Sequence, residues 1–218
     1  MKGMFIKDLC IMKLQVRFFI LIVILAVMLA ANGSGASFFL SYVMFVFSIF
    51  TITTISYDEM DNGMMYLLTL PVTRKQYVLE KYLFGIFMIG LSAVISLLLM
   101  PAGLMIQKAE LNMTELLLVT AMTTGIVLVF LAMAFPVQFK FGSEKGRIMM
   151  FILFAVIVLV MVGAEKILGM YGIDLEASLN QLENVGAGVA AAIPLIFGLL
   201  AYGISVMVSL KILEKKEY

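Results

Sequence analysis

The sequence predicts an all-α membrane protein with six transmembrane helices and with both termini in the cytoplasm. Three observations support this fold class. First, 63% of the 218 residues are hydrophobic and 13% are charged, which is about half the charged fraction of a soluble domain. Second, the hydrophobic residues form six long runs. Third, the basic residues gather in alternate segments between those runs. We expect one transmembrane domain over residues 1–218.

Four of the six runs, the second, third, fourth and sixth, have the roughly 20 apolar residues that a membrane-spanning helix needs, and the first and fifth are shorter. The predicted spans are residues 18–31, 36–56, 82–106, 116–137, 148–164 and 188–210. The first is short, but it gains length if Arg17 snorkels toward the lipid headgroups. The start of the chain also resembles a secretory signal. Because its basic segment is long and apolar and further spans follow, we expect a retained first helix.

The orientation follows from the Lys and Arg residues, which concentrate on the cytoplasmic side of membrane proteins. If the N-terminus is cytoplasmic, all but two of the 15 basic residues fall in cytoplasmic segments. The two exceptions are Lys108 and Lys166. Removing one span would reverse the later loops and erase this asymmetry, so the charge pattern also supports the number of spans.

Composition argues against several classes of function. The net charge of +1 indicates no nucleic-acid partner. The chain has no His, the commonest general base and metal ligand, and Cys10 alone cannot form an internal disulfide. No phosphate-loop motif occurs, so we expect neither catalysis nor ATP hydrolysis by this chain. The predicted spans carry no charge, which argues against a proton- or ion-driven transporter.

Two segments outside the spans have the periodicity of an amphipathic helix. In residues 1–17 the apolar stripe consists of Phe5, Leu9, Met12 and Val16. We expect a helix in the membrane interface there, and a ragged cytoplasmic start of the first span is the alternative. In the outer loop, residues 165–187, leucines recur at helical spacing. We expect a short amphipathic or re-entrant helix in this loop, and a plain solvated loop is the alternative.

The segment between the second and third spans, residues 57–81, is the longest charged interruption in the first half of the chain. Two capping-box patterns, at residues 56–59 and 73–76, each predict the start of a helix, and Pro71 ends the first of these helices. The apolar stripe between them consists of Met60, Met64, Leu67 and Leu68. A chain reversal needs fewer residues, and the acidic side chains disfavour an anionic lipid surface. We therefore expect a docking element for a partner protein, with an interfacial helix as the alternative.

Hydroxyl side chains are frequent in the spans, most of all in the second one, which leads into residues 57–81. Ser48, Thr51 and Thr54 are the candidates for lining a substrate path through the membrane. The alternative is that these hydroxyls join helices by hydrogen bonds, as polar residues commonly do in membranes.

The two predicted cytoplasmic loops carry a resemblance to a known family. In the first loop, Asp58 and Glu59 precede Leu-Thr-Leu-Pro-Val-Thr-Arg at residues 68–74 and Tyr-Val-Leu-Glu-Lys-Tyr-Leu at residues 77–83. In the second, Phe-Gly-Ser-Glu-Lys-Gly-Arg occupies residues 141–147. Together they resemble the loops of ABC-2 type permeases, and the spacing of the spans matches along the whole chain. Small bacterial permeases that export phenol-soluble modulins or other antimicrobial peptides are similar in size. Large members have a big extracellular domain, for which the outer loops here are too short.

The resemblance implies a type V exporter-like fold in the bacterial plasma membrane. It also implies a permease homodimer or heterodimer bound to separate ABC ATPase subunits, which would bind ATP and Mg, while this chain would hold no cofactor. Export of amphipathic or apolar substrates, such as cytolytic or antimicrobial peptides, would be driven through a coupling helix near residues 58–70. The alternatives are an antimicrobial-peptide immunity permease, a drug or lipid permease and, more distantly, a channel or scaffold. Expected contacts to the ATPase subunit are Asp58, Glu59, Asp61, Met64, Leu67, Leu70, Pro71 and Arg74. The candidate site residues of the second cytoplasmic loop are Gly142, Glu144, Lys145 and Arg147.

Overall fold

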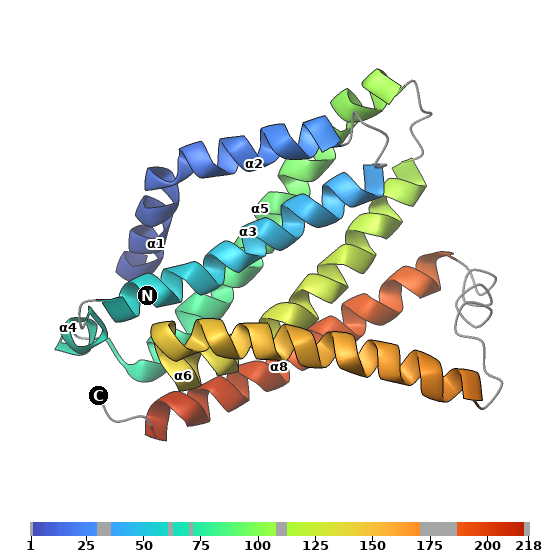
Figure 1. Ribbon diagram of the computed structural model, residues 1–218. Helices are drawn as coiled ribbons and strands as arrows, with labels where there is room; N and C mark the ends of the chain where they lie inside the picture. Colours follow the sequence, from blue (N-terminus) through green and yellow to red (C-terminus); the bar gives the residue numbers. More distant parts are fainter. Residues whose placement is uncertain are drawn as a thin grey trace.

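The described part of the chain is built from α-helices and short connections, as the sequence predicts. A computed structural model describes residues 2–29, 36–60, 63–69, 72–107, 113–170 and 187–215. The helices are α1 (Lys2–Leu14), α2 (Val16–Leu29), α3 (Ala36–Glu59), α4 (Gly63–Thr69), α5 (Arg74–Gln107), α6 (Met113–Met170) and α8 (Ala187–Lys215). Figure 1 shows them as a bundle of long helices, with the short α4 at one end.

Four described stretches are long and apolar enough to cross a membrane. They are Leu40–Glu59, Arg74–Leu98, Leu116–Gly142 and Gly188–Lys215. The pair α1 and α2, bent by 60° at their junction, can supply a fifth. The predicted span at residues 148–164 lies within α6 but is not among these stretches, so the total of six spans stays a prediction. The outer loop between α6 and α8 lies largely outside the described residues.

Helix α6 consists of two arms that meet at Gly142. The backbone there has φ 74° and ψ −175°, which is not helical. In Figure 1 the yellow-green first arm and the orange second arm both extend from this break toward the other end of the bundle, so the chain reverses its direction there. The second predicted cytoplasmic loop is therefore a sharp reversal, because both arms remain helical up to Gly142.

The two capping-box predictions have different outcomes. The box at residues 73–76 is confirmed: the Gln76 backbone N–H donates to Thr73 Oγ1, and the Thr73 N–H donates to Gln76 Oε1, each at 3.2 Å. The box at residues 56–59 is wrong, because α3 continues through Ser56 to Glu59. The Ser56 hydroxyl donates to the Ile52 carbonyl one turn back, so it does not cap a helix.

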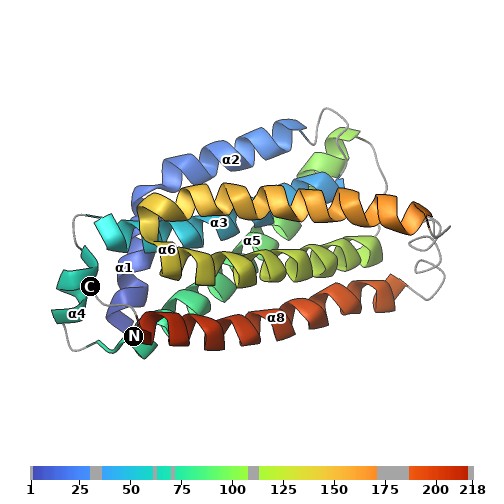
Figure 2. The same ribbon diagram turned by 60° about the horizontal axis from the view of Figure 1, so that its bottom comes forward.

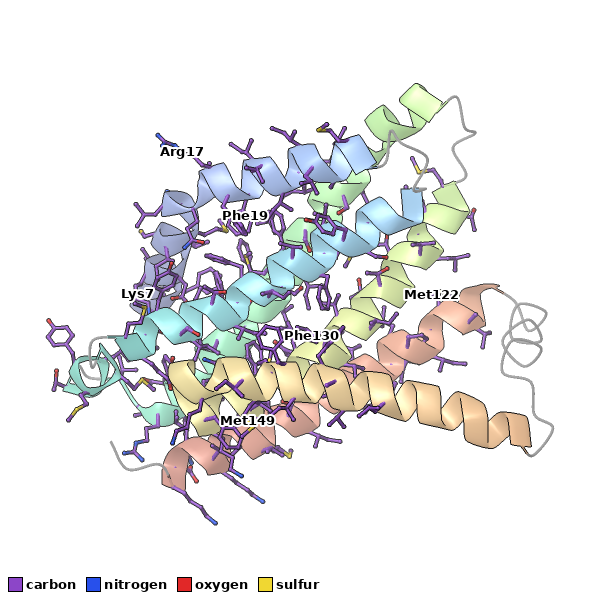
Figure 3. The ribbon with its side chains drawn as sticks, in the orientation of Figure 1. Lys7, Arg17, Phe19, Met122, Phe130 and Met149 are labelled. Atoms are coloured by element: carbon purple, nitrogen blue, oxygen red, sulfur yellow. The ribbon has the colours of Figure 1, made fainter. Side chains whose placement is uncertain are left out.

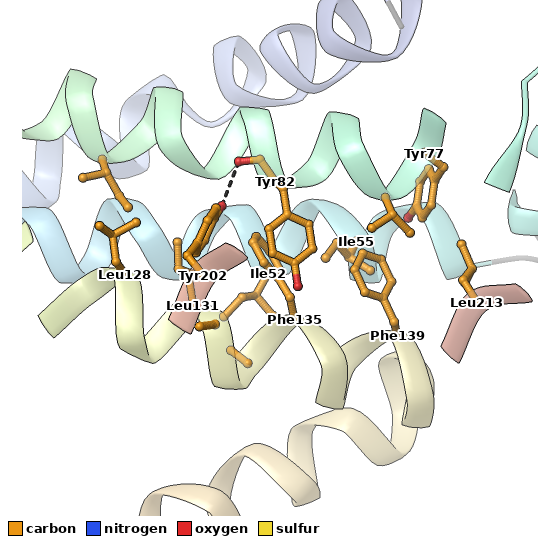
Figure 4. Packing of buried hydrophobic residues seen from close by; sticks show 14 of the residues in the cluster. Ile52, Ile55, Tyr77, Tyr82, Leu128, Leu131, Phe135, Phe139, Tyr202 and Leu213 are labelled. Atoms are coloured by element: carbon orange, nitrogen blue, oxygen red, sulfur yellow. Dashed lines mark hydrogen bonds between the residues drawn. The ribbon is translucent and has the colours of Figure 1, made fainter. Parts of the chain in front are cut away.

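The main core lies where α3, α5, α6 and α8 meet, and it contains a ring cluster that Figure 4 shows from close by. The Tyr82 and Phe135 rings lie 4.5 Å apart. The Tyr202 hydroxyl donates to the Tyr82 carbonyl at 2.7 Å, and the Tyr82 hydroxyl lies 2.6 Å from Ser205 Oγ. Ser205 in turn donates to the Ala132 carbonyl. These buried polar groups are paired, so they join α5, α6 and α8.

Two smaller features position the outer helices. Phe19 of α2 packs against Phe47 and Phe50 of α3, with ring centroids 4.6 and 4.9 Å apart. In Figure 3 Phe19 faces the bundle and Arg17 points away from it. The first arm of α6 approaches α8 closely at Gly125, where an added Cβ would lie 2.4 Å from the Pro194 carbonyl carbon. Only glycine fits at this crossing.

Candidate functional site

One end of the bundle gathers the segments that the sequence predicts to be cytoplasmic. The N-terminus, α4, the break in α6 and the C-terminal end of α8 lie together there in Figures 1 and 2. We call this region the loop end. It comprises α1, residues 56–60 at the end of α3, α4, residues 72–81 at the start of α5, residues 138–146 of α6 and residues 213–215 of α8. The polar side chains that join these segments are the candidate site.

The two predicted cytoplasmic loops touch each other at Glu59 and Gly142. A Cβ built on Gly142 would lie 3.1 Å from Glu59 Oε2, closer than an ordinary contact. The positive φ of Gly142 also favours glycine. The second arm of α6 starts here, and a helix N-terminus favours a nearby carboxylate. A second tie lies next to the first: Gln138 Nε2 donates to Ser56 Oγ at 3.0 Å.

The start of α5 is tied to the end of α8 by Arg74. One guanidinium nitrogen, Nη1, donates to the carbonyls of Leu213 and Glu214, each at 3.1 Å. The last carbonyls of a helix lack partners within it, and the C-terminus carries partial negative charge. Arg74 therefore caps α8. Lys75 and Glu214 add an exposed ion pair at 3.4 Å, which contributes little to stability because water screens it.

A buried ionic network joins α1, α3 and α5. The side chain of Lys81 is fully buried, and its Nζ lies 2.5 Å from Asp8 Oδ2 and 2.7 Å from Asp58 Oδ2. Lys7 pairs with the same two aspartates. The Tyr77 hydroxyl donates to Asp58 at 3.2 Å. Buried charges are tolerated when they are paired and hydrogen-bonded, as they are here.

This network was not predicted from the sequence, although the spacing of apolar residues around Asp8 and Lys81 contains a signal for it. Asp8 follows Met4 and precedes Met12 at steps of four residues, so it lies on an apolar helix face. Lys81 lies four residues after Tyr77 and three to four residues before residues 84–85, so it also lies on a largely apolar helix face. A charge on an apolar face needs a partner of opposite sign. The pattern could have predicted that Asp8 and Lys81 are buried, but not that they meet.

Helix α4 has one face against the body and one face exposed. Met64 and Leu67 are 3% and 8% exposed, which matches the predicted apolar stripe, whereas Met65 and Tyr66 are 53% and 72% exposed. Met60, a predicted member of the stripe, is 53% exposed at the end of α3. The buried pair holds α4 in place, and the exposed Met65 and Tyr66 lie on the surface that α4 offers to another molecule.

The remaining predicted site residues are distributed as follows. Asp58 is buried in the ionic network and Glu59 faces Gly142, so both are engaged within the chain. Lys145 is exposed next to the break in α6. Asp61, Leu70 and Pro71, and the side chains of Glu144 and Arg147, lie outside the described residues.

The candidate path-lining residues are buried inside the bundle. Ser48 donates to the Met44 carbonyl at 2.7 Å, and Thr54 donates to the Thr51 carbonyl at 2.8 Å. Lys81 Nζ lies 3.3 Å from Thr54 Oγ1. The Ser48 and Thr54 hydroxyls thus donate within α3, and only the contact between Thr54 and Lys81 joins two helices. The path-lining role stays a prediction. Within the described residues, no group of three or more potential ligands could hold a metal ion.

The long apolar helices, with a polar joint at one end, define a multi-pass membrane protein. Comparison with known families matches residues 3–214 to the ABC-2 family transporter protein. The match covers nearly the whole chain, so the protein belongs to the ABC-2 transporter family. Membership implies a membrane component of a transporter and an ABC ATPase as its partner. Comparisons with curated proteins and with solved structures gave no match.

Proposed function

We propose that this chain is the non-catalytic permease subunit of an ABC exporter in the bacterial plasma membrane. ATP hydrolysis in a separate ATPase subunit, which binds ATP and Mg, drives it through α4 and the adjoining turns. The observation that carries this proposal is the two-sided α4. Its inner face, at Met64 and Leu67, is fixed to the body, and its outer face, at Met65 and Tyr66, is exposed. A helix of this kind can receive force from a partner and pass it on.

The contacts at the loop end extend that force to most of the bundle. Helix α4 lies between α3 and α5 in the chain. The end of α3 contacts the break in α6 through Glu59 and Gln138, and the start of α5 caps α8 through Arg74. Packed elements that share rigid contacts move together. Displacing α4 therefore acts on four long helices, whereas a simple loop would act on two.

The proposed substrates are amphipathic or apolar molecules, with cytolytic or antimicrobial peptides first among them. The support is the distribution of charge: the described buried charged side chains lie at the loop end, and the spans between them and the opposite end expose or bury apolar and hydroxyl groups. An apolar pathway suits an apolar ligand. Permeases for antimicrobial-peptide immunity, drugs or lipids are the second candidates. Substrate export requires a permease homodimer or heterodimer in this proposal.

Tyr66→Asp tests the coupling role of α4. The chain is co-expressed with a candidate ATPase subunit, and co-purification and ATP turnover are measured in vesicles. We expect Tyr66→Asp to abolish co-purification with the ATPase subunit and ATP turnover. The thermal stability of the permease should stay unchanged, because Tyr66 is exposed. Lys211→Asp, which places the same carboxylate on an exposed residue of α8, is the matched control and keeps both activities. Equal activity in the two variants would contradict the proposal.

Vesicle export of an amphipathic peptide tests the substrate class. ATP-dependent accumulation of the peptide, absent for a scrambled peptide without an apolar face, is the expected result. Export of lipids or drugs in its place would favour the second candidates. Movement that does not require ATP or an ATPase subunit would favour a channel.

A further inference from the structure

A buried carboxylate next to the ionic network has no hydrogen-bond partner among the described residues. Glu80 of α5 is 2% exposed, and among the described residues neither of its carboxylate oxygens has a hydrogen-bond partner. The Lys81 ammonium forms only a long ion pair with it, because Lys81 Nζ lies 4.0 Å from Glu80 Oε2. A buried polar group without a hydrogen bond destabilises the conformation that contains it. Glu80 therefore needs an explanation that the static network does not provide.

Glu80 has no hydrogen bond from Lys81 because the N–H donors of Lys81 are directed to other acceptors. A lysine ammonium has three N–H donors. The three acceptors around Lys81 Nζ are Asp8 Oδ2 at 2.5 Å, Asp58 Oδ2 at 2.7 Å and Thr54 Oγ1 at 3.3 Å. Lys7 pairs with the same two aspartates. Two lysines thus balance two aspartates, and Glu80 is one carboxylate in excess in this conformation.

The position of Asp58 makes this arrangement sensitive to movement. Asp58 lies in the last turn of α3, immediately before α4, whereas Glu80 and Lys81 lie on the same turn of α5. If the end of α3 moves away from α5, Asp58 leaves Lys81, and one ammonium donor becomes free. Glu80 is carried on the same helix as that donor, so it remains within reach wherever α3 goes.

We propose that Glu80 is the alternate acceptor of the Lys81 ammonium, which replaces Asp58 when the end of α3 moves with α4. Glu80 is then a positioning residue of the transport cycle: it stabilises the conformation in which α3 and α5 have separated. The part played by α4 rests on the proposed function, whereas the exchange of partners is a property of this chain alone.

A double-mutant cycle on the purified permease chain tests the exchange without an ATPase subunit. Glu80→Gln removes the unpaired charge, so we expect it to leave the apparent Tm unchanged or to raise it. Asp58→Asn lowers the Tm, and Glu80 limits the loss by taking the freed donor. The double variant loses that replacement, so its Tm falls about 2–4 °C below the sum of the single effects. Additive effects would overturn the proposal, because they mean that Glu80 is unpaired in both backgrounds.

A second cycle covers the case in which Asp58→Asn does not fold. Asp8→Asn frees a different N–H donor of Lys81, so we expect the same departure from additivity with Glu80→Gln. The matched control is Glu214→Gln, which removes an exposed carboxylate paired with Lys75. It should combine additively with either aspartate variant. Non-additivity with this control equal to that of Glu80 would contradict a specific exchange.

The functional arm uses the complete transporter in vesicles. Glu80→Gln is expected to lower ATP-driven transport several-fold although the resting chain is at least as stable as the wild type. A purely structural role would not lower transport while preserving stability. Unchanged transport by Glu80→Gln would overturn the exchange as a step of the cycle. If the wild type did not couple to any ATPase, the proposed function would be overturned. The double-mutant cycle on the isolated chain would still test the exchange of acceptors at Lys81.

Discussion

Replacing Gly142 by Ala tests whether the reversal between the arms of α6 depends on glycine. The backbone there, with φ 74° and ψ −175°, is in a region that is essentially restricted to glycine. Forcing a residue with a Cβ into it costs about 1–3 kcal/mol. For a chain of this length, 1 kcal/mol shifts the Tm by about 2–4 °C. We therefore expect Gly142→Ala to lower the apparent Tm by about 2–12 °C.

Part of that loss comes from a side-chain contact and part from the backbone, and the two can be separated. The new Cβ would lie 3.1 Å from Glu59 Oε2, so the carboxylate must shift. In a Glu59→Ala background this contact is absent, and only the backbone cost remains. The difference between the two Gly142→Ala effects measures the contact between the two cytoplasmic loops. Thermal unfolding in detergent, followed by circular dichroism, provides the measurement.

The control is Gly90→Ala, in a helical position of α5 where a Cβ meets nothing within 4 Å. Alanine has the higher helix propensity, so the Tm should stay the same or rise slightly. If Gly142→Ala were no more destabilising than Gly90→Ala, the reasoning about the reversal would be refuted. If its effect were the same with and without Glu59, the Glu59 carboxylate would not contact residue 142.

Two further predictions concern the buried charges and the orientation. Lys81→Met leaves Asp8 and Asp58 buried with one cation fewer, so the free energy of unfolding should fall by about 3–5 kcal/mol. The exposed control Lys75→Met should change the free energy of unfolding little. Equal effects of the two variants would show that the network is not buried. Cysteines introduced at Ser143 and Ser178, in a chain whose Cys10 has been replaced, should react with a membrane-impermeant reagent from the cytoplasmic and the outer side respectively. Labelling of both from one side would rule out the six-span topology.

Local patterns in the sequence predicted the parts of the fold whose energetics are local. The helical class and four of the spans follow from the length of apolar runs, because a bilayer requires continuous apolar helices with paired backbone groups. The cap at residues 73–76 was predictable because its two hydrogen bonds join residues three positions apart. The same pattern at residues 56–59 failed, because Ile52 and Ile55 are buried in the core and keep α3 helical through Ser56.

The sequence by itself determined that this is a multi-span helical protein of the ABC-2 family, with a helical, partly apolar segment between two of its spans. Only the tertiary structure decided how that segment is joined to the rest. The pairs Glu59 with Gly142, Arg74 with Leu213 and Lys81 with Asp8 are far apart in the chain. Their partners depend on which helix faces meet, and that choice is made by the packing of the whole core. The segment at residues 57–81 therefore contacts α6 and α8 as well as the two helices that it joins, and the outer face of α4 is one of the surfaces that it leaves exposed.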